Sequence, residues 1–239
     1  MLLEVNNLNT YYGSSHVLQN MSISVDQGEI VALLGRNGMG KSTTMKSIMG
    51  LVKPRSGTVV YKGKDIFGHP PYKVARVGIG YVPEERRIFP NLPVVDNLSM
   101  GIKHGKRALS AAGKSKWDLE RVYEHFPILK ERTGQKGSTL SGGEQQMLAI
   151  ARTLMGNPDL LMVDEPTEGL SPVMTTEVRD VLAEINKTGV PILLIEHNLK
   201  VAMSLADRVY LMGKAQLGFT GTVEELEADP EMRAKYLEV

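Results

Sequence analysis

The sequence has no cysteine among its 239 residues, which excludes disulfide bonds, thiolate metal sites and a cysteine nucleophile. It has no excess of charge either, because 28 lysines and arginines stand against 27 aspartates and glutamates. Without an overall positive field, we expect no nucleic-acid partner. No apolar run approaches the about 18 residues of a membrane span, and the first residues show no signal-peptide pattern. If the protein acts at a membrane, we expect other subunits to hold it there.

Short apolar runs are the main feature of the chain. They are continuous rather than alternating, which is typical of strands covered on both faces in a parallel sheet. The four runs are Glu29–Leu34, Gly78–Val82, Asp159–Val163 and Pro191–Ile195. Helical patterns lie between or after them at Lys41–Met49, Ser141–Met155, Pro172–Asn186 and Leu199–Leu205. This alternation predicts an α/β fold with a mainly parallel sheet.

The two ends of the chain have a different pattern. Three shorter, more alternating segments predict an antiparallel β layer, namely Leu2–Leu8, Met21–Val25 and Gly57–Tyr61. Arg208–Thr220 predicts two more strands around Gly213, and a capping box at Thr222–Glu225 predicts the start of a final helix.

A helical insert is predicted from Pro93 to about Gly137, with one helix at Asp118–Phe126 that Pro127 ends. The segment Lys103–Lys116 has five lysines and arginines and no acid, and we interpret it as a solvated loop rather than a contact with an anionic surface. We therefore expect a single domain over residues 1–239. Its core comprises 1–92 and 138–239, and the insert at 93–137 continues into the helix that starts near Ser141.

Residues 35–42 read GRNGMGKS and match the phosphate-loop pattern G-x-x-x-x-G-K-[ST] between a predicted strand and a predicted helix. Glycines let backbone N–H groups turn toward a phosphate, and the helix dipole adds positive potential. Lys41 can reach the β and γ phosphates, while the Ser42 hydroxyl can ligate Mg²⁺. The sequence thus predicts a nucleoside triphosphate site formed by Gly35, Arg36, Asn37, Gly38, Met39, Gly40, Lys41, Ser42 and Thr43.

Two acids follow the buried run Leu160–Val163. Asp164 and Glu165 come at the carboxyl end of a predicted parallel strand, the edge at which open α/β sheets place their ligands. We expect Asp164 to hold Mg²⁺ through water and Glu165 to act as the general base toward an attacking water.

The segment LSGGEQQ at 140–146 predicts a helix start with Ser141 as its cap and Glu144 completing a capping box. Gly142 and Gly143 leave the first N–H groups open, which makes a second anion site. One ATP hardly needs two such sites in one chain, so the second is expected to close on a nucleotide held by another subunit. This segment resembles the signature of ABC-type ATPases, and the resemblance extends over nearly the whole chain.

The resemblance implies a P-loop NTPase core of the ABC type, with an antiparallel β layer and an inserted helical subdomain. It implies a head-to-tail dimer with two ATP molecules and Mg²⁺, in which Ser141 and Gly143 contact the γ-phosphate bound by the partner and Gly142 belongs to the same nucleotide-binding segment. His197 matches the family's switch histidine, which contacts the γ-phosphate. The expected catalytic residues are thus Glu165, His197 and Lys41. Tyr12 is at the position that stacks on adenine, with Tyr11 as its rival.

Two residues depart from the family pattern. Glu84 stands where a glutamine is usual and is expected to ligate Mg²⁺, and Ser171 stands where an inter-subunit aspartate is usual. With Thr167–Pro172 and Ile195–Asn198, these departures resemble LivF-type subunits of branched-chain amino acid importers. Alternatives are an importer of urea or short amides, an export or lipopolysaccharide-extraction ATPase, and an ABC-type ATPase that acts on nucleic acid.

The importer interpretation implies partners outside this chain. They are a second, identical or similar ATPase subunit, integral membrane permeases and, indirectly, a periplasmic solute-binding protein. Bound through the permeases, the chain would lie at the cytoplasmic face of the inner (plasma) membrane.

Overall fold

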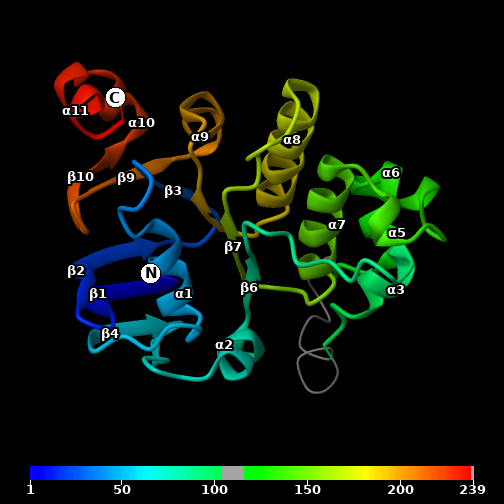
Figure 1. Ribbon diagram of the computed structural model, residues 1–239, viewed down its shortest axis with the longest axis horizontal. Helices are drawn as coiled ribbons and strands as arrows, with labels where there is room; N and C mark the ends of the chain where they lie inside the picture. Colours follow the sequence, from blue (N-terminus) through cyan, green and yellow to red (C-terminus); the bar gives the residue numbers. More distant parts are fainter. Residues whose placement is uncertain (104–115, 238–239) are drawn as a thin grey trace.

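The computed structural model describes residues 1–103 and 116–237, which form two β-sheets and a surrounding set of helices (Figure 1). Of the basic segment Lys103–Lys116, all but the two end residues lie outside the described part. The strands are β1 Leu3–Tyr12, β2 Ser15–Val25, β3 Ile30–Gly35, β4 Ser56–Tyr61, β5 Lys64–Asp65, β6 Ile79–Val82, β7 Leu160–Asp164, β8 Ile192–Ile195, β9 Arg208–Gly213 and β10 Gln216–Thr222. The helices are α1 Lys41–Ile48, α2 Pro71–Val77, α3 Val94–Ser99, α5 Leu119–His125, α6 Pro127–Glu131, α7 Gly142–Leu154, α8 Pro172–Lys187, α9 Leu199–Leu205, α10 Val223–Glu227 and α11 Pro230–Leu237.

The larger sheet has the strand order β10-β9-β3-β8-β7-β6, and its strands from β9 to β6 run parallel. All residues of β3, β7 and β8 are buried, which explains their continuous apolar sequences. The predicted α/β fold with a mainly parallel sheet is confirmed. The strand β9 also belongs to this sheet, beside β3, and β10 forms a hairpin with it. That hairpin turns at Lys214 and Ala215, which both have positive φ, rather than at Gly213.

The smaller sheet has the order β2-β1-β4-β5 and is antiparallel, as the alternating segments predicted. Its strands β1 and β2 are longer than expected because they continue to the turn at Gly13. One hydrophobic core joins both sheets through α1, whose Met45 and Ile48 are buried with residues of β1 and β3. This packing fixes α1 between the sheets, directly after the phosphate-loop sequence.

A second core lies on the other side of the larger sheet and extends into the helical lobe formed by α3, α5, α6 and the signature helix α7. Figure 1 shows this lobe in green at one end of the molecule, with α8 between it and α9. The end of α5 follows the prediction, but Pro127 also starts α6, which the sequence analysis did not predict. The boundaries proposed for the insert remain a prediction.

Asn97 of α3 anchors the loop that leads from the core into the helical lobe. Its side chain is fully buried, and its Oδ1 accepts a hydrogen bond from Phe89 N at 2.8 Å. Its Nδ2 donates to the carbonyl oxygens of Phe89, Leu92 and Pro93 at 2.9–3.2 Å. The side chain therefore ties together four backbone groups of the irregular loop, adding to the backbone hydrogen bonds that the three carbonyl oxygens already accept.

Replacing Asn97 by alanine is expected to lower the free energy of unfolding by about 2–3 kcal/mol, because the four buried hydrogen bonds of its side chain with the loop backbone are lost. Denaturant unfolding monitored by circular dichroism measures this change. The control is Ser99→Ala on the same helix, at an exposed residue, with an expected change within about 0.5 kcal/mol. Equal stability of the two variants would contradict the assignment.

Candidate active site

The phosphate loop needs glycine at two positions. Gly35 and Gly40 have φ values of 145° and 100°, and a Cβ on either would collide with the structure beneath, at the Met212 carbonyl oxygen and the Leu18 side chain respectively. The Lys41 side chain is buried and bridges the loop, because its Nζ donates to the carbonyl oxygens of Gly35 at 2.8 Å and Arg36 at 3.1 Å. Burial lowers the pKa of Lys41, although the neighbouring acids oppose this effect. The loop thus holds the Lys41 ammonium group in place at the start of α1.

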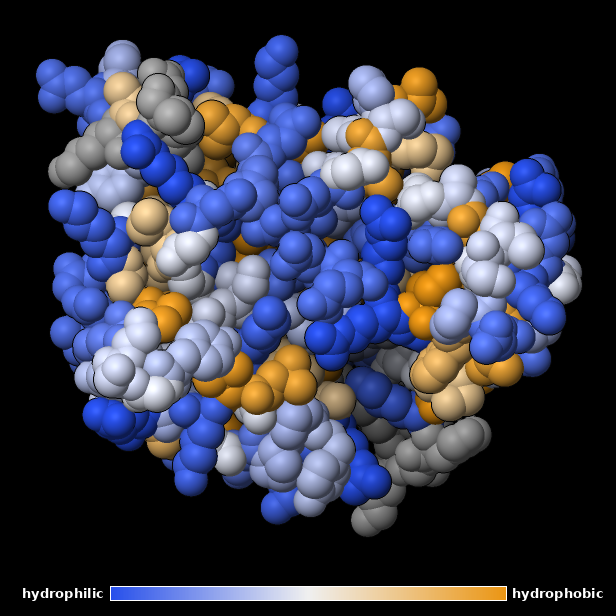
Figure 2. Space-filling view, in the orientation of Figure 1, coloured by the Kyte–Doolittle hydropathy of each residue, from blue (hydrophilic) through white to orange (hydrophobic). Residues whose placement is uncertain are grey.

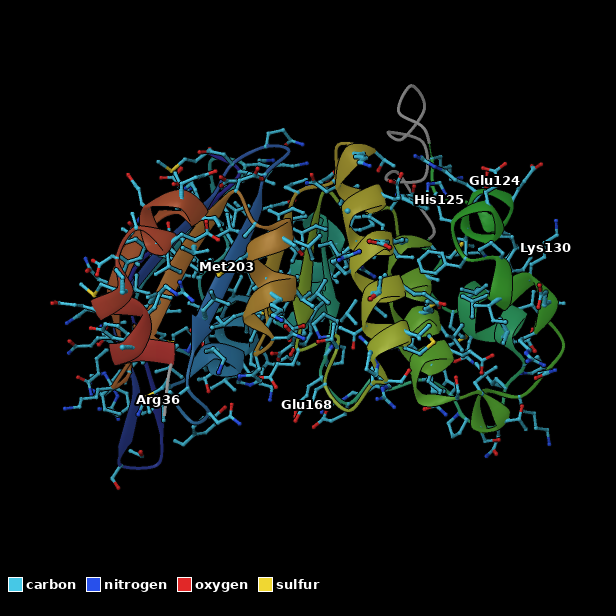
Figure 3. The ribbon with its side chains drawn as sticks, turned by 90° about the horizontal axis from the view of Figure 1, so that it is seen from above. Arg36, Glu124, His125, Lys130, Glu168 and Met203 are labelled. Carbon is cyan, nitrogen blue, oxygen red and sulfur yellow. The ribbon has the colours of Figure 1, made fainter. Side chains whose placement is uncertain are left out.

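A pocket of about 280 Å³ lies over this loop. Phosphate-loop residues and three glutamates line it together, in the set Val17, Asn37, Gly38, Gly40, Lys41, Ser42, Thr43, Glu84, Glu165 and Glu168. In Figure 3, Arg36 of the loop and Glu168 lie along the same edge of the molecule. Segments far apart in the sequence therefore meet where β3, β6 and β7 end.

Asp164 is the last residue of β7 and is fully buried. Its Oδ1 accepts a hydrogen bond from Ser42 Oγ at 2.9 Å, and its Oδ2 accepts one from the Tyr81 hydroxyl at 3.0 Å. Burial raises the pKa of Asp164, against the effect of these two hydrogen bonds. The sequence analysis predicted Ser42 and Asp164 but missed Tyr81, whose position near the end of the neighbouring strand β6 was the available signal.

Glu165 follows directly with a φ of 50°, a backbone conformation uncommon for a residue other than glycine. Its Oε1 lies 2.6 Å from Nε2 of His197, so the structure brings the two predicted catalytic residues together. Burial, and then a hydrogen bond with Glu168, raise the pKa of Glu165 to about 8, while Lys41 opposes this. Burial and the charge of Lys41 lower the pKa of His197. The raised pKa of Glu165 suits a group that exchanges a proton near neutral pH.

Three carboxylates converge on the pocket, since ligand oxygens of Glu84, Glu165 and Glu168 all lie within 4.8 Å of one another. Burial raises the pKa of Glu84, and the charges of Glu168 and Asp164 add to this. Carboxylate and hydroxyl oxygens are the ligands that Mg²⁺ prefers. A divalent cation would also offset the electrostatic repulsion between these neighbouring carboxylates. The residues present therefore fit Mg²⁺. The sequence analysis did not single out Glu168, although it follows Glu165 by three positions on a turn.

The two candidate tyrosines have different surroundings at the end of β1. The Tyr11 ring stacks on His16 at a centroid distance of 4.0 Å and lies 3.9 Å from the Arg55 guanidinium. Tyr12 is 47% exposed. Of the two rings, Tyr12 is the one available to a base, although it does not contribute to the lining of the pocket.

The signature residues lie at the start of α7, and the described residues that line the pocket do not include Ser141, Gly142 or Gly143. The predicted capping box is present, with Ser141 Oγ accepting from Glu144 N and Glu144 Oε2 accepting from Ser141 N. Burial works against ionisation of Glu144, but its hydrogen bonds with Ser141 and its ion pair with Arg132 lower the pKa of its carboxyl. A Cβ on Gly142 would meet the Arg86 guanidinium at 3.2 Å.

Ser171 caps α8, its Oγ accepting from Met174 N at 3.4 Å. It is exposed on the loop that follows Glu165. Its predicted role between subunits remains a prediction.

Comparison with known proteins adds the family. Residues 18–168 match the family described as ABC transporter. The chain is 38% identical to the high-affinity branched-chain amino acid transport ATP-binding protein BraG of Pseudomonas aeruginosa, over 99% of both chains. It is 34% identical to the lipopolysaccharide export system ATP-binding protein LptB of Escherichia coli K12, over 98% of this chain and 96% of that protein.

Solved structures have the same fold. A structure described as the ADP conformation of MJ1267, an ATP-binding cassette of an ABC transporter, superposes with a TM-score of 0.81 at 27% identity, over 96% of each chain. A nucleotide-free cassette from an ABC transporter superposes with a TM-score of 0.81 at 28% identity, also over 96% of each. Together with the phosphate loop and the acids at the end of β7, these matches show that the chain belongs to the ABC transporter family and is one of its ATP-hydrolysing subunits.

Proposed function

We propose that this chain is the ATP-driven motor subunit of an importer for branched-chain amino acids. The observation on which the motor role rests is one pocket lined by Lys41 and Glu165. Asp164 is hydrogen-bonded to Ser42 of its lining, and His197 lies 2.6 Å from Glu165. The substrate class is supported by the 38% identity to BraG across the full length, against 34% to the export protein LptB.

In the proposed reaction, the phosphate loop and Lys41 bind the β and γ phosphates. Ser42, Asp164 and Glu84 would hold Mg²⁺, which supplies positive charge against the phosphates. Glu165 accepts the proton of the water that attacks the γ-phosphate, and His197 orients the Glu165 carboxylate through their 2.6 Å contact. The Tyr81 hydroxyl and Ser42 fix the carboxylate plane of Asp164.

A second ATPase subunit completes the site in this proposal. The open N–H groups of Gly142 and Gly143, with Ser141, would bind the γ-phosphate of the ATP held by the partner. Tyr12 would stack on adenine. This arrangement would give a role to the predicted second anion site, whose residues do not line the pocket over the phosphate loop.

A groove between the core and the helical lobe supports the proposed permease contact. It has a volume of about 520 Å³ and runs over β6, between α1 and α2 on one side and α7 and residues 100–103 after α3 on the other. Exposed apolar side chains at its rim include Leu51, Phe89, Met100 and Ile102. Figure 2 shows the hollow beside the helical lobe, with hydrophobic residues on both sides. Such a concentration of exposed apolar residues is typical of an interaction site.

In the described part of the chain, no helix is both long and apolar enough to span a bilayer. In this proposal, permeases bound at the groove hold the chain at the cytoplasmic face of the membrane. A periplasmic solute-binding protein would deliver the amino acid to those permeases.

Purifying the complex from native membranes tests the substrate. We expect permeases to co-purify with the chain. Vesicles that contain the purified complex should then accumulate labelled leucine in an ATP-dependent manner. Uptake of urea or a short amide instead, or association with lipopolysaccharide-export components, would replace the proposed substrate but retain the motor role. A salt-dependent nucleic-acid affinity would contradict both.

Glu165→Gln is expected to reduce ATP hydrolysis by at least about 100-fold, because the variant has no general base. ATP binding should persist, since Lys41 and the phosphate loop are unchanged. Phosphate release and fluorescent-nucleotide binding measure the two effects. Glu177→Gln, at an exposed residue of α8, is the control and should hydrolyse ATP like the parent. Undiminished turnover in the Glu165 variant would refute the role of Glu165.

Gly142→Asp is expected to abolish ATP-dependent subunit association and hydrolysis, because it adds a negative charge at the proposed γ-phosphate contact. ATP binding by the separate chain should change less than threefold, since its own pocket is intact. Light scattering and nucleotide titration measure these. The control is Gly134→Asp, where a Cβ meets nothing within 4 Å. If the isolated Gly142→Asp chain no longer binds ATP, the signature residues belong to the chain's own nucleotide site and not to that of the partner.

In the nucleotide-free and metal-free chain, ionisation of Glu165 should make the free energy of unfolding depend on pH. The pKa of Glu165 is raised from 4.5 to about 8, so the folded state favours its protonated form. This stabilising contribution is complete below the ordinary pKa and is lost as the pH rises toward 8. The parent should therefore lose stability relative to Glu165→Gln between pH 5 and pH 8, by thermal unfolding. Parallel curves for the two proteins would contradict the raised pKa.

A further inference from the structure

A buried carboxylate lies behind the pair Glu165 and His197. Glu196 directly follows β8 and is only 3% exposed. Its Oε1 accepts hydrogen bonds from the backbone N–H groups of His197 at 2.8 Å and Asn198 at 2.9 Å. Its Oε2 accepts one from Thr167 Oγ1 at 2.8 Å.

These hydrogen bonds join two loops. Thr167 is 7% exposed and lies two residues after Glu165, on the loop between β7 and α8. His197 lies on the loop between β8 and α9. The side chains of Glu165 and His197 meet 2.6 Å apart on the pocket side, and Glu165 N donates to Ile195 O at 2.9 Å. Glu196 and Thr167 therefore close a ring of contacts around the end of two neighbouring strands.

The chemistry of Glu196 makes this ring specific. Ionised carboxylates are costly to bury unless they are hydrogen-bonded, and three donors satisfy this one. Two of the donors are the backbone N–H groups of His197 and Asn198. They lie on either side of the Cα atom that carries the His197 ring. An error of about 1 Å in such a position can cost about 100-fold in rate. The third donor connects these backbone groups to the loop from which Glu165 projects.

We propose that Glu196 is a positioning residue that, through Thr167 and the backbone of His197, keeps the imidazole of His197 in register with the carboxylate of Glu165. This inference rests on the proposed function of those two residues. Glu196 does not touch the nucleotide in this proposal. It acts only through the position of the His197 imidazole relative to the Glu165 carboxylate.

The test uses the full-length chain in its native membrane complex and measures kcat and KM for ATP. Thr167→Val removes only the hydroxyl that donates to Glu196, and Thr167→Ser retains it. We expect kcat to fall by at least about tenfold in Thr167→Val with KM within threefold, and Thr167→Ser to recover most of the loss. Thr188→Val is the matched control, because its hydroxyl caps the exposed end of α8, and it should behave like the parent.

A double-mutant cycle distinguishes positioning from general stability. Glu196→Gln should lower kcat in the parent but change it less than twofold when His197 is already alanine, because Glu196 acts through that side chain. Additive losses in the two backgrounds, or an unchanged kcat in both Glu196→Gln and Thr167→Val, would overturn the proposal. Thermal unfolding of each variant confirms that it is folded before its rate is interpreted.

The same cycle separates this inference from the proposed function. If His197→Ala alone leaves hydrolysis unchanged, the catalytic assignment of His197 fails, and the positioning role fails with it. If His197→Ala is slow while the Glu196 and Thr167 variants are not, only the positioning role fails.

Discussion

The parallel pairing of β3, β8, β7 and β6 is the constraint on which the site depends. Because neighbouring parallel strands point the same way, the loops after all four of them emerge at one edge of the sheet. The phosphate loop follows β3, Glu84 follows β6, the two acids end β7 and His197 follows β8. The register between Asp164 and Ile195 then sets the distance between the last two of these loops. The order of the strands thus brings the residues of the site together.

Much of this arrangement can be predicted from the sequence. Buried parallel strands require continuous apolar runs, and the phosphate loop requires glycines at fixed spacing, so both leave strong local patterns. The capping box at Ser141 and Glu144 is equally local. The placement of β9 beside β3 was not predicted, because the two strands are far apart in the sequence and their pairing leaves no periodic signal.

The contacts within the site are also long-range. The hydrogen bond between Tyr81 and Asp164 joins two strands, and no local pattern in the sequence indicates the positive φ of Glu165. Glu196 would be read from the sequence as an ordinary acid near a strand end, since nothing local shows that Thr167 lies opposite it. Residue types predicted which groups could act, while the fold determined which of them meet.

The ion pair of Glu144 with Arg132 has a consequence for the timing of the proposed machine. Because the carboxyl stays ionised, it keeps a negative charge one turn from the helix end that would face the partner's phosphate, and this charge weakens the attraction of the helix dipole. In the proposed closed assembly, this charge would hold the two subunits together less tightly than a neutral side chain at that position. Weaker association would let the two subunits separate faster after each round of hydrolysis.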